Sequence, residues 1–223
     1  MSLATLKEKV GQLIEKAQSG GGGEVALWRS AIENDTYTNG ISVFRGYKGT
    51  KVPYFGTLAT KNTSHMFNSA INITSIDFYI DCPNSTNGSG MFYGTTAFKY
   101  LKGVNCSKMT NINQMCDRSG LEEIEMPLDI SSVTNIGSAF ACPLKEIRFI
   151  SECIKVNCSF QWSPSLSAES KQSIFDGLAT VTTAQTLTLN ANAKILQSQV
   201  DSANAKGWTI AGGTVVSKEE YYG

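Results

Sequence analysis

Hydrophobic and polar positions recur along the middle of the chain with a period of about two dozen residues. Four octapeptides, 60–67, 85–92, 109–116 and 133–140, align without gaps. Each has asparagine at its third position, so the interval between successive asparagines is nearly constant. A fixed period of this length predicts an array of similar structural units. The recurring asparagines and the terminal aromatic residues are Asn62, Asn87, Asn111, Asn135, Phe67, Phe92 and Phe140, with Cys116 in the third copy.

A second pattern, apolar-x-x-apolar-x-apolar, follows each octapeptide after a short loop. Its alternation predicts a short strand with one buried face. No unit of this size can bury its apolar face alone, so the units must stack on one another. The sequence therefore predicts an α/β fold, a right-handed leucine-rich-repeat solenoid with one short strand per repeat, over residues 57–190. The four copies are Ile73, Ile76, Phe78; Phe98, Leu101 and, one residue late, Val104; Leu121, Ile124, Met126; and Leu144, Ile147, Phe149.

The stacking assigns roles to the recurring positions. We expect the last two residues of each octapeptide to point into the core. We expect each repeated asparagine to lie where the chain turns and to bond to the backbone of the neighbouring unit, because buried polar groups need partners. These roles are structural rather than catalytic.

The N-terminal residues predict three segments. Apolar residues from Leu3 to Ala17 are spaced 3, 4, 3 and 4, which favours an amphipathic, coiled-coil-like helix over residues 1–18. A glycine-rich linker is expected at 19–23. Segment 24–56 is rich in aromatic residues, which favours an N-terminal cap that covers the first repeat. The helix either docks onto a partner, with homo-oligomerisation as one form of docking, or packs on its own domain.

Helical turns are expected toward the C-terminus. Ser167 can cap a helix over about 168–179, and a second helix is expected at about 193–205. Strands are expected at 186–189 and 208–210, and the interval from Leu187 to Ile210 matches the repeat period, so the repeat continues. Residues 191–223 form a terminal repeat or cap, with a polar tail from Val215 that we expect to fray.

Composition narrows the classes of partner. Lys+Arg and Asp+Glu both number 19, so no basic excess favours nucleic acid or an anionic membrane surface. The sequence contains no run of about 18 apolar residues, so we expect no membrane-spanning helix. Charged residues such as Lys7 and Glu8 interrupt the first 18 positions, so we expect no signal peptide there.

Catalytic chemistry has little support in the sequence. His65 is the one histidine, and its repeat equivalents Gly90, Gln114 and Ser138 are so varied that we expect it to face solvent. A single histidine excludes multi-histidine zinc sites, and no G-x-S-x-G motif is present. The six cysteines lack zinc-site spacing and are expected to be mostly free and packed as small hydrophobes. We expect no enzyme activity, no cofactor and no metal.

Charged residues alternate along the predicted strands. Asp77, Lys102, Glu125 and Arg148 occupy equivalent outward positions, and neighbouring strands lie about 4.8 Å apart, so they should form one column. One interpretation is an ion-pair ladder that fixes strand register, and the other is a concave binding face. The flanking residues of the candidate face are Lys99, Tyr100, Glu122, Glu123, Lys145 and Glu146.

Two stretches of the repeats resemble a known family. Residues 121–132 and 133–140 are similar to the BspA-type leucine-rich repeats of bacterial surface proteins, and the resemblance covers roughly residues 57–160. It implies extracellular location and adhesion. The N-terminal helix with its glycine linker resembles the start of phage and prophage tail-associated proteins, and residues 165–189 resemble the closing segment of prophage-encoded leucine-rich-repeat proteins. These resemblances imply a virion-associated or extracellular protein.

Three functional hypotheses follow. The first is a non-enzymatic module of a phage or prophage that binds a protein or cell-surface ligand. The second is an exported bacterial adhesin. The third, from a different class, is a hydrolase of surface glycans.

Overall fold

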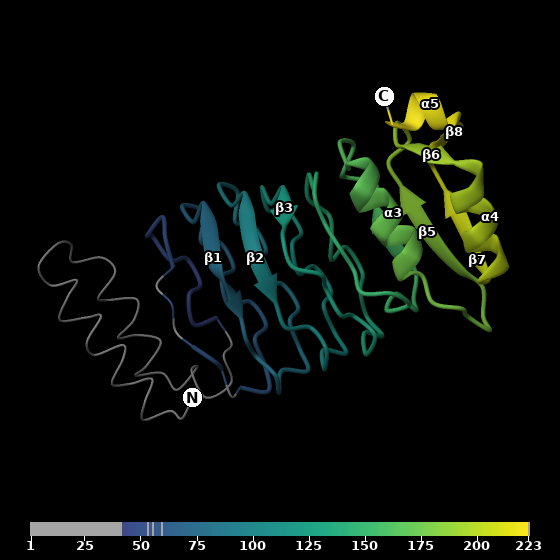
Figure 1. The fold of residues 1–223 in the computed structure, drawn as a ribbon. Helices are drawn as coiled ribbons and strands as arrows, with labels where there is room; N and C mark the ends of the chain where they lie inside the picture. The colour runs from purple at the N-terminus through teal and green to yellow at the C-terminus, as the bar shows by residue number, and fades with distance from the viewer. Residues whose placement is uncertain (1–41, 53, 55, 59, 223) are drawn as a thin grey trace, which may run out of the picture.

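The computed structural model describes residues 42–222, except 53, 55 and 59. The predicted helix 1–18, the linker 19–23 and most of the predicted cap 24–56 lie outside these residues. The described chain is a mixed α/β structure in which successive turns of the chain stack side by side, from the blue end to the yellow end of Figure 1. The mixed α/β class is confirmed.

Small parallel sheets connect successive turns. They have the strand orders β1-β2-β3, β4-β5-β7 and β6-β8. Helices occur only after Phe160 among the described residues (Figure 1). The elements are β1 Ser75–Ile80, β2 Tyr100–Val104, β3 Glu123–Ile124, β4 Cys158–Phe160, α3 Ala168–Gly177, β5 Gln185–Leu189, β6 Lys194–Leu196, α4 Gln197–Ala205, β7 Trp208–Ala211, β8 Thr214–Val216 and α5 Lys218–Tyr222.

The repeat register predicted from the asparagines is present in the backbone. Asn62, Asn87, Asn111 and Asn135 form consecutive parallel bridges. The amides of Thr63, Gly88 and Ile112 donate to the carbonyls of Asn87, Asn111 and Asn135 at 2.8–2.9 Å. The next turn therefore satisfies the backbone polar groups of the turn before it.

The asparagine side chains bond differently from the expectation. The Oδ1 atoms of Asn62, Asn87 and Asn111 accept hydrogen bonds from backbone amides two residues further along the same turn. This is the local bonding by which asparagine stabilises a tight turn. The prediction of side-chain bonds to the neighbouring unit was wrong, because the backbone itself makes that connection.

Aromatic rings line up through the core. Phe44 stacks on Phe67 with ring centroids 4.8 Å apart, and Phe67 stacks on Phe92 at 5.5 Å. Phe140 stacks on Phe160 at 5.1 Å, with Cys116 at the equivalent position between the two groups of rings. All these side chains are buried. The expected inward direction of the octapeptide ends is confirmed.

The strand pattern needs two corrections. Ile76, Leu101, Ile124 and Ile147 are fully buried, as expected, but Met126 is 37% exposed and Leu128 takes the buried position. The chain bends after Ile124, and Leu128 then pairs with Phe149. A register irregularity between Ile76 and Tyr79 similarly leaves Phe78 half-buried and places Ile80 in the core.

Helix α3 replaces a strand in the stack. Ser167 caps its first turn by accepting a hydrogen bond from the Ser170 amide. Ser170 and Ser173 accept hydrogen bonds from the amides of Ile147 and Phe149, which an adjacent strand would otherwise bind. The helix ends at Gly177, two residues before the expected end.

The C-terminal segment is more ordered than the sequence suggested. Leu187 pairs with Ile210, so the predicted continuation of the repeat is confirmed. The predicted helix 193–205 begins at Gln197, because Lys194–Leu196 forms β6 and pairs with β8. The expected fraying from Val215 was wrong. Tyr221 is buried, and its hydroxyl donates to the Ala168 carbonyl at 3.0 Å.

Candidate functional site: the strand face

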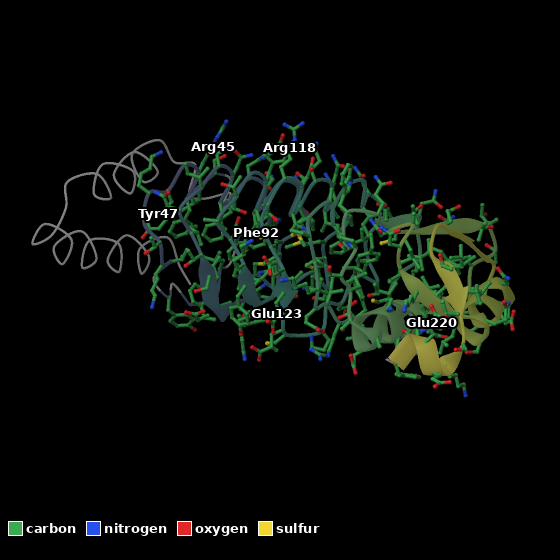
Figure 2. The ribbon with its side chains drawn as sticks, turned by 90° about the horizontal axis from the view of Figure 1, so that it is seen from above. Arg45, Tyr47, Phe92, Arg118, Glu123 and Glu220 are labelled. Atoms are coloured by element: carbon green, nitrogen blue, oxygen red, sulfur yellow. The ribbon has the colours of Figure 1, made fainter. Side chains whose placement is uncertain are left out.

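The outward side of the strands carries most of the predicted site residues. Tyr100 pairs in register with Glu123, and Glu123 pairs with Glu146, so these three side chains occupy one row across three turns. Lys102, Glu125 and Arg148 lie two residues further along the same turns. We call the outward surface over residues 99–102, 122–125 and 145–148 the strand face. Figure 2 shows its Glu123 on the opposite side of the stack from Arg45 and Arg118.

An ion bridge spans three turns at one edge of this face. Lys99 Nζ lies 2.7 Å from one carboxylate oxygen of Glu122, and Lys145 Nζ lies 2.6 Å from the other. Hydrogen bonds from Lys145 and Lys99 lower the pKa of Glu122 to about 2. The Glu122 carboxylate between its two lysines therefore stays ionised to a lower pH than an isolated glutamate.

A second network lies beside the first. Glu125 accepts hydrogen bonds from both the Lys102 ammonium and the Tyr100 hydroxyl. The bonds from Lys102 and Tyr100 lower the pKa of Glu125, and the bond to Glu125 raises the pKa of Tyr100 to about 12. Arg148 contributes a weaker electrostatic effect in the same direction on Glu125.

The remaining predicted residues behave differently. Asp77 is exposed and makes no hydrogen bond or ion pair with the described residues. The β1 register shifts between Ile76 and Tyr79, and among the four charges of the predicted column the described ion pair is Lys102–Glu125. Glu146 accepts hydrogen bonds from the hydroxyls of Ser167 and Ser170, so it joins the strand face to α3.

His65 lies in the turn formed by residues 64–69. Its ring is half-buried rather than solvent-facing, and its Nδ1 lies 3.2 Å from the Asn68 amide nitrogen. The six cysteines are buried and unpaired, and burial raises the pKa of Cys82 and Cys158 to about 12. Such thiols stay protonated and are poor nucleophiles. No group of three or more His, Cys, Asp or Glu residues in the described ranges is arranged to hold a metal ion.

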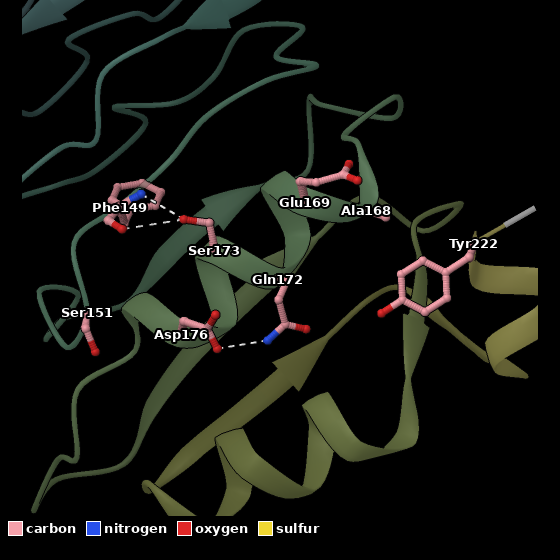
Figure 3. A pocket seen from close by; sticks show the side chains of 8 residues that line it. All are labelled: Phe149, Ser151, Ala168, Glu169, Gln172, Ser173, Asp176 and Tyr222. Carbon is pink, nitrogen blue, oxygen red and sulfur yellow. Dashed lines mark hydrogen bonds between the residues drawn. The ribbon is translucent and has the colours of Figure 1, made fainter.

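Sequence reasoning missed one pocket. It lies beside α3, with a cavity volume of about 520 Å³ (Figure 3). Its lining residues come from three separated segments, which is why no local motif revealed it. The spacing of Glu169, Gln172, Ser173 and Asp176 along one polar helix face is the signal that could have pointed to it. The lining is completed by Phe149, Ser151, Ala168 and Tyr222.

Two further findings concern the whole described chain. None of its helices is both long enough and apolar enough to cross a bilayer. Comparison with known proteins found no matching family model, no matching curated protein and no matching solved structure.

Proposed function

We propose that this chain is a non-enzymatic binding module, built as a leucine-rich-repeat solenoid, that recognises a protein or cell-surface ligand through its strand face. The observation that carries the proposal is the ordered set of charged and phenolic groups that crosses three stacked turns. Lys99 and Lys145 both form ion pairs with Glu122. Tyr100 and Lys102 both donate hydrogen bonds to Glu125. Groups fixed before binding lose little conformational entropy when a ligand arrives.

The stacking itself supports this role. Repeat proteins use the continuous surface of successive units to bind extended partners. Successive turns here pair in parallel, each with the next, and a repeat of about two dozen residues with this pairing is typical of leucine-rich repeats. The BspA-type resemblance favours the same class of fold and an adhesive role.

The biological setting is a proposal that rests on resemblance. We favour a phage or prophage component for structure or receptor recognition, because the chain ends resemble proteins of that kind. An exported bacterial adhesin is the alternative, with the same binding surface in a different setting. Neighbouring genes that encode tail components would favour the first, and a longer native N-terminus with a signal peptide would favour the second.

The proposal is tested by a pull-down of labelled full-length protein against bacterial cells, cell-wall polymers and host matrix proteins. The variant Lys99→Ala/Lys102→Ala removes two cations from the strand face. The variant Arg45→Ala/Arg118→Ala removes two cations from the opposite side and serves as the matched control. We expect the first variant to lose at least tenfold in bound fraction and the second to bind as the parent does. Equal binding by all three proteins would contradict the role of the strand face.

A further inference from the structure

The α3 pocket adjoins the strand face but contains none of its charged residues. Its polar lining divides into groups that already have partners and groups that do not. Gln172 Nε2 donates to Asp176 Oδ1 at 2.8 Å, and Gln172 Oε1 accepts from Gln199 Nε2 at 2.9 Å. Figure 3 shows the Gln172–Asp176 bond along the helix. The side-chain amide of Gln172 is therefore occupied within the protein.

Ser173 is occupied as well. Its Oγ accepts a hydrogen bond from the Phe149 amide at 2.9 Å and lies 3.5 Å from the Phe149 carbonyl oxygen (Figure 3). The pocket thus offers a ligand few hydrogen-bond donors from its helix side.

The groups left available are two carboxylates, which only accept hydrogen bonds, and the hydroxyls of Ser151 and Tyr222, which can donate or accept. The exposed Glu169 carboxylate has no hydrogen bond or ion pair with any described residue, and the second oxygen of Asp176 is also without one. The Tyr222 ring is 68% exposed at the rim. Two carboxylates and an open aromatic ring form this part of the lining, and no lining residue carries a positive charge.

The lysine of α3, Lys171, does not line the pocket, although it lies close enough to Glu169 for their charges to interact. The Lys171 ammonium donates to the Lys194 carbonyl at 2.8 Å and lies 4.4 Å from the centre of the Tyr221 ring, so it is held by the C-terminal packing. The pocket lining therefore contains two carboxylates, Glu169 and Asp176, and no cationic side chain.

Hydrolysis of a glycan is a poor match for these carboxylates. Glu169 and Asp176 are seven residues apart on one face of α3, so both carboxylates lie on the same side of the pocket. Glycosidase carboxylates face each other across the scissile bond at about 5 to 9.5 Å. Both carboxylates here project from the same wall.

We propose that the α3 pocket binds the cationic side chain of an arginine or lysine on a partner protein. A guanidinium group or an ammonium group donates hydrogen bonds and accepts none, which matches the two free carboxylates of the lining. An arginine also stacks on an exposed aromatic ring, as Tyr222 would allow. A neutral sugar offers no positive charge to pair with Glu169 and Asp176.

The test is a titration of ¹⁵N-labelled full-length protein with N-acetyl-arginine amide, followed by amide NMR shifts. The neutral control ligand is N-acetyl-citrulline amide, which has the same shape without the charge. We expect saturable shifts of the Gln172 side-chain amide and the Ser151 and Ser173 backbone amides. Affinity for the citrulline compound should be at least tenfold lower.

Variants distinguish arginine binding in the α3 pocket from nonspecific electrostatic attraction to the protein. Glu169→Gln and Asp176→Asn should each weaken arginine binding about fivefold or more. Asp201→Asn is the matched control, because Asp201 accepts from Gln197 in α4 as Asp176 accepts from Gln172 in α3. Asp201→Asn should bind the arginine compound as tightly as the parent does. The Lys99→Ala/Lys102→Ala variant changes only the strand face and should also bind it as the parent does.

Three results would overturn the proposal. They are the absence of saturable shifts with the arginine compound, equal affinity for the citrulline compound, and equal weakening by Asp201→Asn. Shifts of the same amides by methyl glucoside but not by the arginine compound would instead assign the pocket to a neutral sugar.

Discussion

One position of each octapeptide shows how backbone conformation decides which residues are acceptable. His65, Gly90, Gln114 and Ser138 are equivalent, and all four have φ between +52° and +58°. Left-handed backbone is unfavourable for residues with a Cβ atom by about 1–2 kcal/mol. The sequence variation at this position was interpreted as solvent exposure, but the shared feature is this turn conformation. Burial ranges from the enclosed Gly90 to the exposed Ser138.

Gly90 is needed for a second reason. A Cβ atom at this position would lie 2.5 Å from Nδ1 of His65 in the preceding turn. We expect Gly90→Ala to destabilise the protein by about 2 kcal/mol or more, from left-handed strain and this contact together. The measurement is urea unfolding of the parent, Gly90→Ala, His65→Gly and the double variant. The cycle should show a favourable coupling of about 0.5–3 kcal/mol, and simple additivity would refute the contact.

Glu122 predicts a pH dependence. Its pKa in the folded state is about 2, below its usual 4.5, because Lys145 and Lys99 stabilise the charged form. The stabilisation is therefore fully present above about pH 4.5 and is lost as the pH falls toward 2. Because the pairs are largely exposed, its size is at most about 1 kcal/mol. The stability difference between parent and Glu122→Gln should shrink over this pH range in unfolding experiments, and a difference that grows on acidification would contradict the ion bridge.

At the scale of elements, the stacking of successive turns was predicted from the sequence more accurately than the positions where the strands end. The period of the asparagines and the apolar octapeptide ends predicted the core because these positions repeat without gaps. Met126 was misplaced because the alternating pattern continues to it, whereas the backbone bends and Leu128 enters the core. Tertiary contacts also order the tail, since Tyr221 packs under α3 and accepts a hydrogen bond from Gln199.

Half of the candidate strand face was predictable for the same reason. The equivalent repeat positions identified Lys99, Glu122 and Lys145 as neighbours, and these residues do form an ion bridge. Asp77 lies at the β1 irregularity and forms no ion pair with Lys102, and no sequence signal marks that irregularity beyond the late Val104. The α3 pocket depends on Tyr222 and Phe149, which belong to distant parts of the sequence, so only the folded structure brings them together.

The corrected strand register makes a direct prediction. Met126→Lys should change stability by less than about 0.5 kcal/mol, because its side chain is on the outer surface. Leu128→Lys would bury an unpaired charge. We expect it to unfold the protein or to lower its free energy of unfolding by on the order of 4 kcal/mol. The milder Leu128→Ala should still cost about 2–5 kcal/mol. Thermal unfolding of the three variants checks the assignment, and the reverse order would restore the register expected from the sequence.

At the scale of the whole molecule, the N-terminal segment predicts assembly. Residues 1–18 have a heptad pattern of apolar residues, and the glycine linker at 19–23 separates them from the repeats. If this helix docks onto other copies, removal of residues 1–23 should lower the mass measured by light scattering to that of a single chain. The chain without these residues should keep its thermal unfolding midpoint. An unchanged mass on deletion would rule out oligomerisation through this segment.

The central claim is that successive turns stack in parallel register, each bonded to the next. Scalar couplings across hydrogen bonds, measured by NMR on perdeuterated protein, test it most directly. The account predicts couplings from the amide nitrogens of Thr63, Gly88 and Ile112 to the carbonyl carbons of Asn87, Asn111 and Asn135. Couplings from these amides to residues within their own turn, or to another register, would contradict the stacked arrangement and the proposed binding surface.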